Sequence, residues 1–403
     1  MNTPISNELR FEKWVYGGEA LAREEGRVVL VPFVLPGELA RVEPVSEKPS
    51  LVRARLKEIA EPSPERIQAK CRHFAICGGC HYQHSGYDYE VARKVEILGE
   101  VLRRVGKLEP PGLIGVVRGP EWEYRNRVQL HIDGARIGFH EAGSHRVRGI
   151  DYCPVASPTL NKALEIVRGM ARQRQWPRFL KTLELFTNEN EVQVNALDSG
   201  ARRLNRGFFE WCERQLPGAL SPSLDYPVAG DQFRVSYQSF FQVNRFLVDK
   251  LVETALDGAE GAEALDLYAG VGLFSIALAR RGFRVTAVES GASAITDLEY
   301  NALRAGVDVG AVRMQSEQYL ERLESCPEFV LADPPRAGLG KQVVRRLAEL
   351  KPPGITIVSC DVSTLARDLA ALVAGGYKVE AMTIVDLFPR TAHIESVTRL
   401  RLG

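Results

Sequence analysis

The sequence predicts an α/β protein in three parts: a small β-barrel, a central α+β region, and a doubly wound parallel sheet at the C-terminal side. Three observations support this prediction. Short apolar runs separated by glycine and proline come first, a cluster of cysteines follows, and strand patterns then alternate with helix patterns from about residue 226 onward. Such alternation is typical of a parallel sheet covered by helices. We expect the parts to span residues 1–61, 62–225 and 226–403.

The composition narrows the class of protein. Of the 403 residues, 45% are hydrophobic and 26% are charged, which is ordinary for a globular protein and excludes disordered, collagen-like and coiled-coil chains. No apolar stretch approaches the ~18–20 residues of a membrane helix, and the first residues lack the basic-then-apolar order of a signal peptide. Charge nearly cancels, with 52 Lys and Arg against 51 Asp and Glu. We expect a cytoplasmic monomer without a membrane partner.

The first part carries strand patterns. Runs such as RVVLVPFV and ELARVEPV lie between turns marked by Gly17-Gly18, Gly26 and Pro36-Gly37. Short strands at this spacing indicate a small barrel or sandwich. Small barrels of the oligonucleotide-binding kind carry nucleic acid on one face, so this part is a candidate nucleic-acid-binding element.

The central part opens with a candidate metal site. Its four cysteines are Cys71, Cys77, Cys80 and Cys153. An odd total of seven cysteines in a reducing compartment argues against a disulfide framework. Gly78 and Gly79 free the backbone to wrap around one centre. Four thiolates suit tetrahedral zinc and equally suit an iron–sulfur cluster, so both remain open here, as do buried thiols without a metal. Three histidines offer alternative ligands: His73, His81 and His84.

A helix and several strands complete the central part. The segment YDYEVARKVEILGEVLRRVG predicts a helix that ends at Gly106. The alternating stretches RNRVQLHID, RIGFHE and EVQVNAL predict strands. This part is therefore α+β.

A glycine-rich turn follows the first strand of the C-terminal part, in ALDLYAGVGLFSIALARRG. Gly270 and Gly272 let the chain turn sharply and bring backbone amides against a ligand. The next strand ends in Glu289, whose carboxylate can accept both hydroxyls of a ribose. Ser275 stands where a dinucleotide site has its third glycine, so the pattern favours S-adenosylmethionine over NAD. A turn without a ligand is the alternative.

The ends of other strands also contain candidate catalytic and binding residues. PEFVLADPPRAGL contains Asp333, which two prolines aim outward from the carboxyl edge of the sheet. Cys360 lies between a strand and a helix, where the helix dipole favours the thiolate of a nucleophile. An inert buried thiol is the alternative. The turn in LFPRTAHIESVTRLRL has His393 and Glu395 beside it.

Together these motifs resemble the S-adenosylmethionine-dependent RNA uracil-5-methyltransferases over nearly the whole chain. The first part resembles an RNA-binding barrel of the TRAM type, and C-x5-C-G-G-C with the distal D-Y-C-P resembles the [4Fe-4S] site of the family. SFFQVN, DLYAGVGLFS, LADPPRAGL, VSC and FPRTAHIESV follow in the family's order. The resemblance implies a Rossmann-like class I methyltransferase domain at the C-terminal side. The presence of both barrel and cluster favours 23S ribosomal RNA as substrate, with transfer RNA as the alternative.

The resemblance also assigns roles residue by residue. It makes Cys360 the nucleophile that adds to carbon 6 of uracil, and Glu395 the base that removes the proton from carbon 5. The cofactor site comprises Gln242, Tyr268, Gly270, Glu289 and Asp333. The cluster ligands are Cys71, Cys77, Cys80 and Cys153.

The chain departs from the family directly after the nucleophile. Asp361 and Val362 stand where the family usually has Asn-Pro. This difference puts in doubt how the loop holds the edge of the uracil. Two other classes of function stay open. An amino-group methyltransferase also uses a D-P-P motif to orient an exocyclic amine, but that function leaves Cys360 and Glu395 without a task. A non-catalytic RNA-binding protein is the second.

Overall fold

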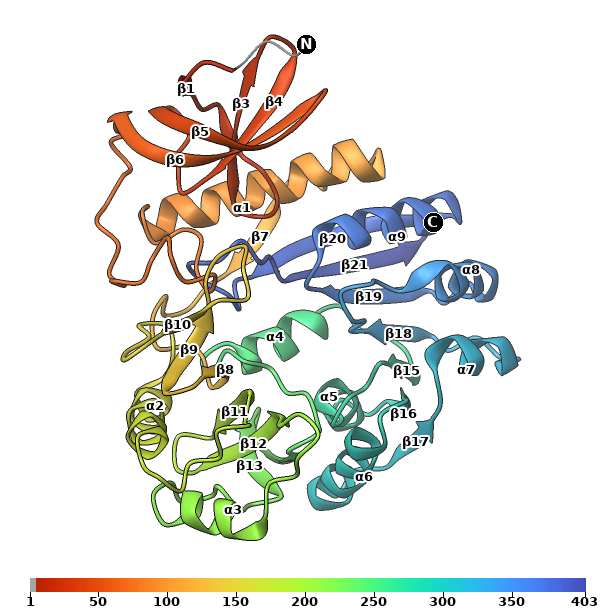
Figure 1. Cartoon of the computed structure of the whole chain (residues 1–403). Helices are drawn as coiled ribbons and strands as arrows, with labels where there is room; N and C mark the ends of the chain where they lie inside the picture. Colours follow the sequence, from red (N-terminus) through yellow and green to blue (C-terminus); the bar gives the residue numbers. More distant parts are fainter. Residues whose placement is uncertain (1–4) are drawn as a thin grey trace. The chain divides into compact units, whose positions relative to one another are not determined.

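The computed structural model describes residues 5–403, which form two compact units. Unit 1 comprises the chain up to Glu100 with Phe139–Arg148 and Phe388–His393, and unit 2 comprises Val101–Gly138, Gly149–Leu387 and Ile394–Gly403. Each unit is assembled from three separate stretches of sequence (Figure 1). The expected division at residues 61 and 225 stays a prediction. Among the described residues, no helix has the length and apolarity that crossing a membrane requires.

Unit 1 contains a six-stranded sheet in the order β1-β5-β6-β4-β3-β2. Its strands are β1 (Glu8–Arg10), β2 (Lys13–Trp14), β3 (Glu19–Glu24), β4 (Arg27–Pro32), β5 (Leu39–Lys48) and β6 (Leu51–Glu61). Alternate residues of β4, among them Val29 and Val31, are buried, because one face of the sheet packs on a core. The strands expected here are confirmed, whereas a TRAM-type barrel stays a prediction.

The helix expected after the cysteines is present. It consists of α1 (Tyr87–Val101) and one π-helical turn, Leu102–Gly106. The next residue, Lys107, has a positive φ of 54°, which ends the helix. A Cβ at Gly106 would lie 2.8 Å from the carbonyl oxygen of Ala366, so glycine lets this turn approach α9 (Val362–Ala374) closely.

The middle of the chain forms a five-stranded sheet, two helices and a hairpin. The sheet order is β10-β9-β8-β11-β12. The elements are β8 (Arg127–Asp133), β9 (Arg136–His140), β10 (Val147–Gly149), α2 (Pro158–Ala171), β11 (Thr182–Thr187), β12 (Val192–Asp198), α3 (Arg206–Glu213), β13 (Ser223–Val228) and β14 (Asp231–Ser236). Helix α2 begins where the Ser157 hydroxyl accepts from Leu160 N and Pro158 supplies the preset φ of the first turn.

The rest of unit 2 is an eight-stranded sheet in the order β17-β16-β15-β18-β19-β21-β20-β7. Its strands are β7 (Ile114–Val117), β15 (Glu263–Leu267), β16 (Arg284–Glu289), β17 (Val309–Arg313), β18 (Phe329–Ala332), β19 (Gly354–Ser359), β20 (Tyr377–Val385) and β21 (Ser396–Leu402). The helices besides α9 are α4 (Val248–Ala255), α5 (Leu273–Arg280), α6 (Ala292–Ala305), α7 (Ser316–Arg322) and α8 (Gly340–Leu350).

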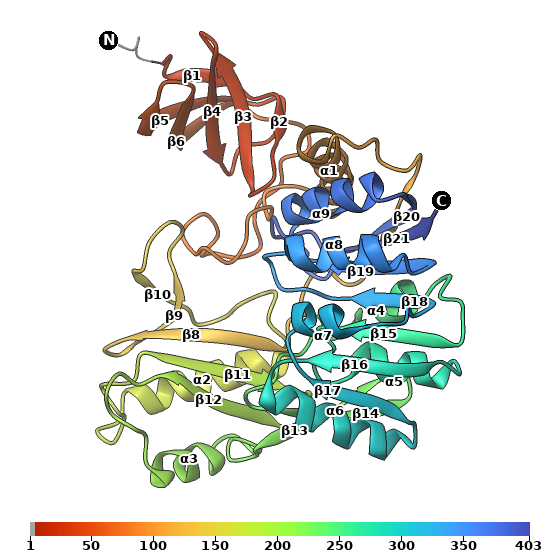
Figure 2. The same cartoon turned by 90° about the vertical axis from the view of Figure 1, so that its right-hand side faces the viewer.

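Helices cover both faces of this sheet. Helices α5 and α6 pack together on one face, and α7, α8 and α9 follow one another on the other (Figures 1 and 2). Every residue of β18 and β19 is therefore buried. The expected parallel sheet is confirmed for β15 to β19. It is wrong for β21, which runs antiparallel to both β19 and β20.

Candidate active site

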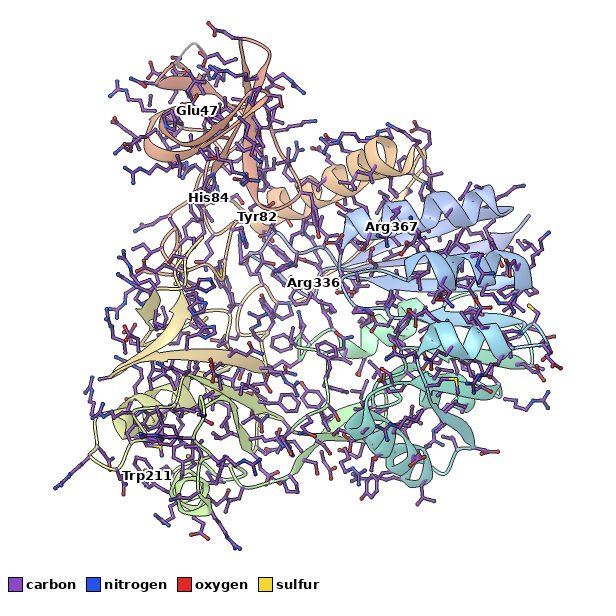
Figure 3. All side chains as sticks on the ribbon, turned by 45° about the vertical axis from the view of Figure 1, so that its right-hand side comes forward. Glu47, Tyr82, His84, Trp211, Arg336 and Arg367 are labelled. Carbon is purple, nitrogen blue, oxygen red and sulfur yellow. The ribbon has the colours of Figure 1, made fainter. Side chains whose placement is uncertain are left out.

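The predicted site residues collect at one edge of the eight-stranded sheet. Tyr268 and Gly270 follow β15, Glu289 ends β16, Asp333 follows β18, and Cys360 follows β19. These four strands are parallel, so their carboxyl ends share that edge. The chain winds outward in both directions from β15 and β18, which makes this edge the place where α/β proteins bind ligands. Arg336, in the loop after β18, lies there as well (Figure 3).

The antiparallel direction of β21 brings Glu395 to the same edge. Ser396, the first residue of β21, pairs with Ser359, the last residue of β19. Cys360 directly follows Ser359 and Glu395 directly precedes Ser396, so both residues flank this last pair, and the charge of Glu395 acts on Cys360. Strand β21 is the last strand in the sequence, and its direction was not predicted. This direction places the predicted base beside the predicted nucleophile.

The glycine turn is fixed by the Glu289 carboxylate. Gly270 N donates to Glu289 Oε2 at 2.9 Å, and Gly291 N donates to Oε1 at 2.5 Å. Tyr268, Gly270 and Gly272 all have positive φ angles of 62°, 55° and 90°. A Cβ on Gly270 would meet nothing within 4 Å, so the space above the turn is open to a ligand. Each carboxylate oxygen keeps a second lone pair for a ribose hydroxyl.

Two acids lie beside this turn, one fully buried and one partly exposed. Asp266, at 0% exposure, accepts a hydrogen bond of 2.5 Å from the Ser275 hydroxyl. Burial, followed by the charges of Asp333 and Glu289, raises the pKa of Asp266 to about 7. Asp333 keeps some exposure, but the surrounding protein raises its pKa to about 7 as well. Gln242 Nε2 lies 3.4 Å from Asp333 Oδ2, so the segment SFFQVN reaches the same acid.

Helix α6 holds this segment through a polar stripe that sequence reasoning missed. Ser293, Asp297 and Asn301 recur every four residues, which puts them on one helix face. Asp297 Oδ2 accepts from Ser239 Oγ at 2.7 Å, three residues before Gln242. Asn301 Nδ2 donates to Val271 O at 3.0 Å, inside the glycine turn. The helical spacing of the three polar residues was the available signal.

The surroundings of Cys360 differ from the expectation. The helix dipole of α9 was expected to favour a thiolate, but burial, then Glu395 and Asp333, raises the pKa of Cys360 to about 12. Arg336 opposes this rise. The free N–H groups at the N-terminus of α9 already have an acceptor, because Asp361 Oδ1 accepts from Ser363 N and Thr364 N at 3.0 and 2.9 Å. The thiol is therefore protonated at neutral pH in this structure.

The departure from Asn-Pro keeps the local structure intact. Asp361 is the N-cap of α9, a position that aspartate and asparagine fill equally well. Val362 takes the first helical position and is completely buried. The loop that carries Cys360 thus remains anchored.

Glu395 is almost completely buried at 5% exposure. Burial, with the Asp333 charge as second cause, raises its pKa well above the ordinary value, and Arg336 lowers it. A carboxyl group whose pKa is raised by its surroundings suits proton transfer.

The four predicted cluster cysteines are divided between the units. Cys71, Cys77 and Cys80 belong to unit 1 and Cys153 to unit 2, and all four are partly exposed. The loop is held by local hydrogen bonds such as Cys77 N to His73 O at 2.8 Å. Within residues 5–403, no three His, Cys, Asp or Glu side chains form a group that could hold a metal ion.

The open glycine turn at a topological switch point, with an acid at the end of the next strand, suits S-adenosylmethionine, and the following comparisons show that the chain is a methyltransferase. Residues 225–401 match the family model of tRNA (uracil-5-)-methyltransferases. The chain is 32% identical to a 23S rRNA (uracil(1939)-C(5))-methyltransferase of Methylococcus capsulatus, over 98% of this chain and 96% of that protein. It is 31% identical to the Halomonas elongata enzyme of the same name, over 98% and 89%.

A solved structure agrees with these relatives. The Pyrococcus abyssi tRNA (uracil-54, C5)-methyltransferase in complex with S-adenosyl-L-homocysteine has a TM-score of 0.76 and 27% identity, covering 97% of this chain and 99% of that one. The chain therefore belongs to the family of S-adenosylmethionine-dependent RNA uracil-5-methyltransferases.

Proposed function

We propose that the chain methylates carbon 5 of one uridine in 23S ribosomal RNA by way of a covalent bond between Cys360 and the uracil. The observation that carries this proposal is that Cys360 and Glu395 flank the last pair of β19 and β21 at the ligand-binding edge, where the charge of Glu395 acts on the thiol. An amino-group methyltransferase needs neither a thiol nor a second acid at that place. We therefore favour attack on a ring carbon.

The residues divide the chemistry between them. Once it has lost its proton, the Cys360 thiolate adds to carbon 6, and the electrons of the carbon 5–carbon 6 double bond move onto the carbonyl oxygen at carbon 4. Carbon 5 then takes a methyl group from the sulfonium, which leaves as a neutral thioether. The Glu395 carboxylate removes the remaining proton from carbon 5. The electrons of that bond restore the double bond, and the Cys360 thiolate departs.

The acidic surroundings make the timing of this chemistry depend on ligands. Cys360 and Glu395 both have raised pKa values while the site holds only protein. A cation placed among buried acids lowers their pKa values. The positive charge of the methyl donor would therefore favour both the thiolate and the carboxylate. We expect the thiol to become reactive only when that donor is in place.

Ribosomal RNA is the favoured substrate because two relatives named for it match almost the whole chain at 31–32% identity. Transfer RNA is the alternative, since the solved relative is named for that substrate. The target base must leave its stack to reach the edge of the sheet. We therefore expect a uridine in a loop or single strand.

We also propose that Cys71, Cys77, Cys80 and Cys153 hold a [4Fe-4S] cluster. The donor set fits: thiolates are the ligands such clusters take, and the four bind separate irons, so they do not have to converge on one ion. A single zinc ion would require such convergence. The fourth ligand stays a prediction, because Cys153 belongs to the other unit. A cluster here would be structural, because no step of the reaction transfers an electron.

Two experiments test the proposal. Uracil-5-tritiated ribosomal and transfer RNA are incubated separately with enzyme and methyl donor, and only methylation at carbon 5 releases tritium. Release from transfer RNA alone would overturn the assignment of substrate. Denaturing gels with labelled methyl donor then test the roles: Cys360→Ala should form no adduct, and Glu395→Gln should accumulate a methylated RNA–protein adduct.

A further inference from the structure

A buried ionic network holds the turn that precedes Glu395. Glu90 and Lys94 lie one turn apart on α1 at 0% and 1% exposure, with Lys94 Nζ 2.8 Å from Glu90 Oε1. Arg390, 300 residues from Glu90, is 2% exposed and places Nη1 3.5 Å from Glu90 Oε2. These three side chains form a charged group in the interior of unit 1.

The same side chains bind the backbone of the turn. Arg390 N donates to Glu90 Oε1 at 2.7 Å, and Lys94 Nζ donates to Phe388 O at 3.1 Å. The Arg390 guanidinium donates in turn to Ser85 O at 2.7 Å. The network therefore fixes the path of residues 388–390 and not only their side chains.

The loop that contains Cys80 also forms hydrogen bonds with the turn at residues 388–392. His81 N and Tyr82 N both donate to Arg390 O, at 2.8 and 3.1 Å. Ala392 N donates to His81 Nδ1 at 3.2 Å, so that ring nitrogen carries no proton. His81 directly follows Cys80 in the sequence, so the loop that carries three predicted cluster ligands also fixes the turn.

We propose that Glu90, Lys94 and Arg390 are positioning residues that set where Glu395 stands for proton abstraction. Buried ion pairs are often no more stabilising than apolar residues of the same size, so three buried charges indicate a need for one geometry. Glu395 lies five residues after Arg390, between this turn and the register of β21. The inference rests on the proposed role of Glu395 as the base.

The test measures how much methylated RNA–protein adduct accumulates during turnover. Arg390→Lys and Glu90→Gln should raise the adduct fraction several-fold, because methyl transfer proceeds while the base is misplaced. Arg66→Lys is the matched control: its guanidinium also pairs with a fully buried acid of unit 1, Glu38, at 2.5 Å. It should destabilise unit 1 without trapping adduct.

Glu395→Gln separates the two hypotheses. If it traps no adduct, the base assignment itself fails. If it traps adduct while folded Arg390→Lys and Glu90→Gln do not, the positioning role is overturned. Equal trapping by Arg66→Lys would also overturn it, because general loosening of unit 1 would then explain the effect. If Arg390→Lys does not fold, Glu90→Gln decides, since it keeps an oxygen that can accept from Arg390 N.

A second, independent observation is a basic surface in the central part of unit 2. Residues 168–181 contain five Lys or Arg and no acid, and residues 199–206 contain three and no acid. The eight are Arg168, Arg172, Arg174, Arg178, Lys181, Arg202, Arg203 and Arg206. All except Arg168, which is partly exposed, are exposed. We call this set the basic surface.

Contacts between the two segments make it one surface. The Arg202 guanidinium lies 5.5 Å from the centre of the Phe179 ring, and Lys181 N donates to Asp198 O at 2.8 Å. Beneath them, Trp176 packs against Trp211 of α3, with ring centres 6.4 Å apart (Figure 3). Among the residues the structure describes, only Arg206 of this set is in an ion pair, with Glu210.

We propose that the basic surface binds the phosphate backbone of the RNA at a distance from the target uridine. Clustered cations without counter-charges repel one another, and a polyanion relieves that repulsion. RNA is the polyanion that this family acts on. The proposal rests on the proposed function for its choice of partner.

The test is the salt dependence of RNA affinity, measured by fluorescence anisotropy with a labelled ribosomal RNA fragment. Replacing Arg174, Arg178, Arg202 and Arg203 by Ala should lower the slope of log Kd against log salt by ~0.7–0.9 for each lost phosphate contact. KM for RNA should rise while kcat at saturating RNA is unchanged. The control replaces four exposed basic residues elsewhere in unit 2: Arg313, Arg322, Lys341 and Lys351.

An unchanged affinity and slope in the first variant would overturn this proposal, and so would equal losses in the control. Tritium release by both variants would show at the same time that the proposed function stands. Absence of release from the wild-type enzyme would instead count against the function.

Discussion

Replacing Glu289 with glutamine should weaken the binding of S-adenosylhomocysteine. The carboxylate accepts from Gly270 N and Gly291 N, one at each oxygen. A glutamine side chain has only one acceptor oxygen, so one of these backbone N–H groups would face an NH2 group instead. The glycine turn would lose one of the contacts that hold it open, and a ribose hydroxyl would lose one acceptor.

The size of the effect follows from these contacts. A hydrogen bond to a charged group is worth ~1.5–3 kcal/mol. Loss of one such bond predicts a Kd that rises roughly 10- to 150-fold. Glu289→Ala removes both acceptors, and we expect it to lose more affinity than Glu289→Gln.

Isothermal titration calorimetry with S-adenosylhomocysteine measures this change directly. Glu299→Gln is the matched control, because Glu299 is an exposed residue of α6 and the change removes the same charge. Thermal unfolding of each variant shows that the fold is kept. An unchanged Kd for Glu289→Gln would refute the role of Glu289, and an equal loss in Glu299→Gln would point to net charge instead.

Four further predictions concern other parts of the molecule. Because the Cys360 pKa is raised to about 12 while the site holds only protein, alkylation of this thiol without methyl donor should accelerate as pH rises across the neutral range, and a flat profile would contradict this. Asp361→Ala should lower the free energy of unfolding by ~0.5–2 kcal/mol through loss of the α9 cap, whereas Asp361→Asn should be near neutral in the same denaturant titration. The pKa of Asp266 is about 7 in the folded state, and in the unfolded chain it returns to its usual lower value. Protonation of Asp266 therefore stabilises the fold fully at low pH, and this contribution is lost as pH rises through 7. Urea titrations at several pH values should show this decline in wild type and its loss in Asp266→Asn. Anaerobically purified protein should contain iron and sulfide. The Cys77→Ser variant should lose both while keeping its affinity for S-adenosylhomocysteine. A colourless protein with one zinc ion per chain would refute the proposed cluster.

The sequence was informative where the signal is local. Glu289, Asp333 and Cys360 each end or follow a short apolar run, and such a run indicates a buried strand whatever its partners are. The direction of β21 is not a local property, because its pairing joins Ser359 to a residue 37 positions away. Sequence reasoning could therefore name Cys360 and Glu395 but not what brings them together.

The surroundings of the functional side chains were harder to predict than the residues themselves. Glu90 and Lys94 look like an ordinary pair on an exposed helix face, and only the fold shows them buried around Arg390. The pKa of Cys360 was expected to be lowered and is raised, first by burial and then by two acids that come from other parts of the sheet. Both observations depend on contacts between residues that are far apart in the sequence.

The place of β21 in the sheet has a consequence for biosynthesis. A ribosome delivers residues in order, and β21 must enter between β19 and β20, which are made before it. Until translation has passed Leu402, β19 lacks this neighbour and Cys360 stands without Glu395. A nascent chain that already carries the thiol thus lacks the proposed base that would release the RNA, and the chain acquires the proposed catalytic pair only late in its own synthesis.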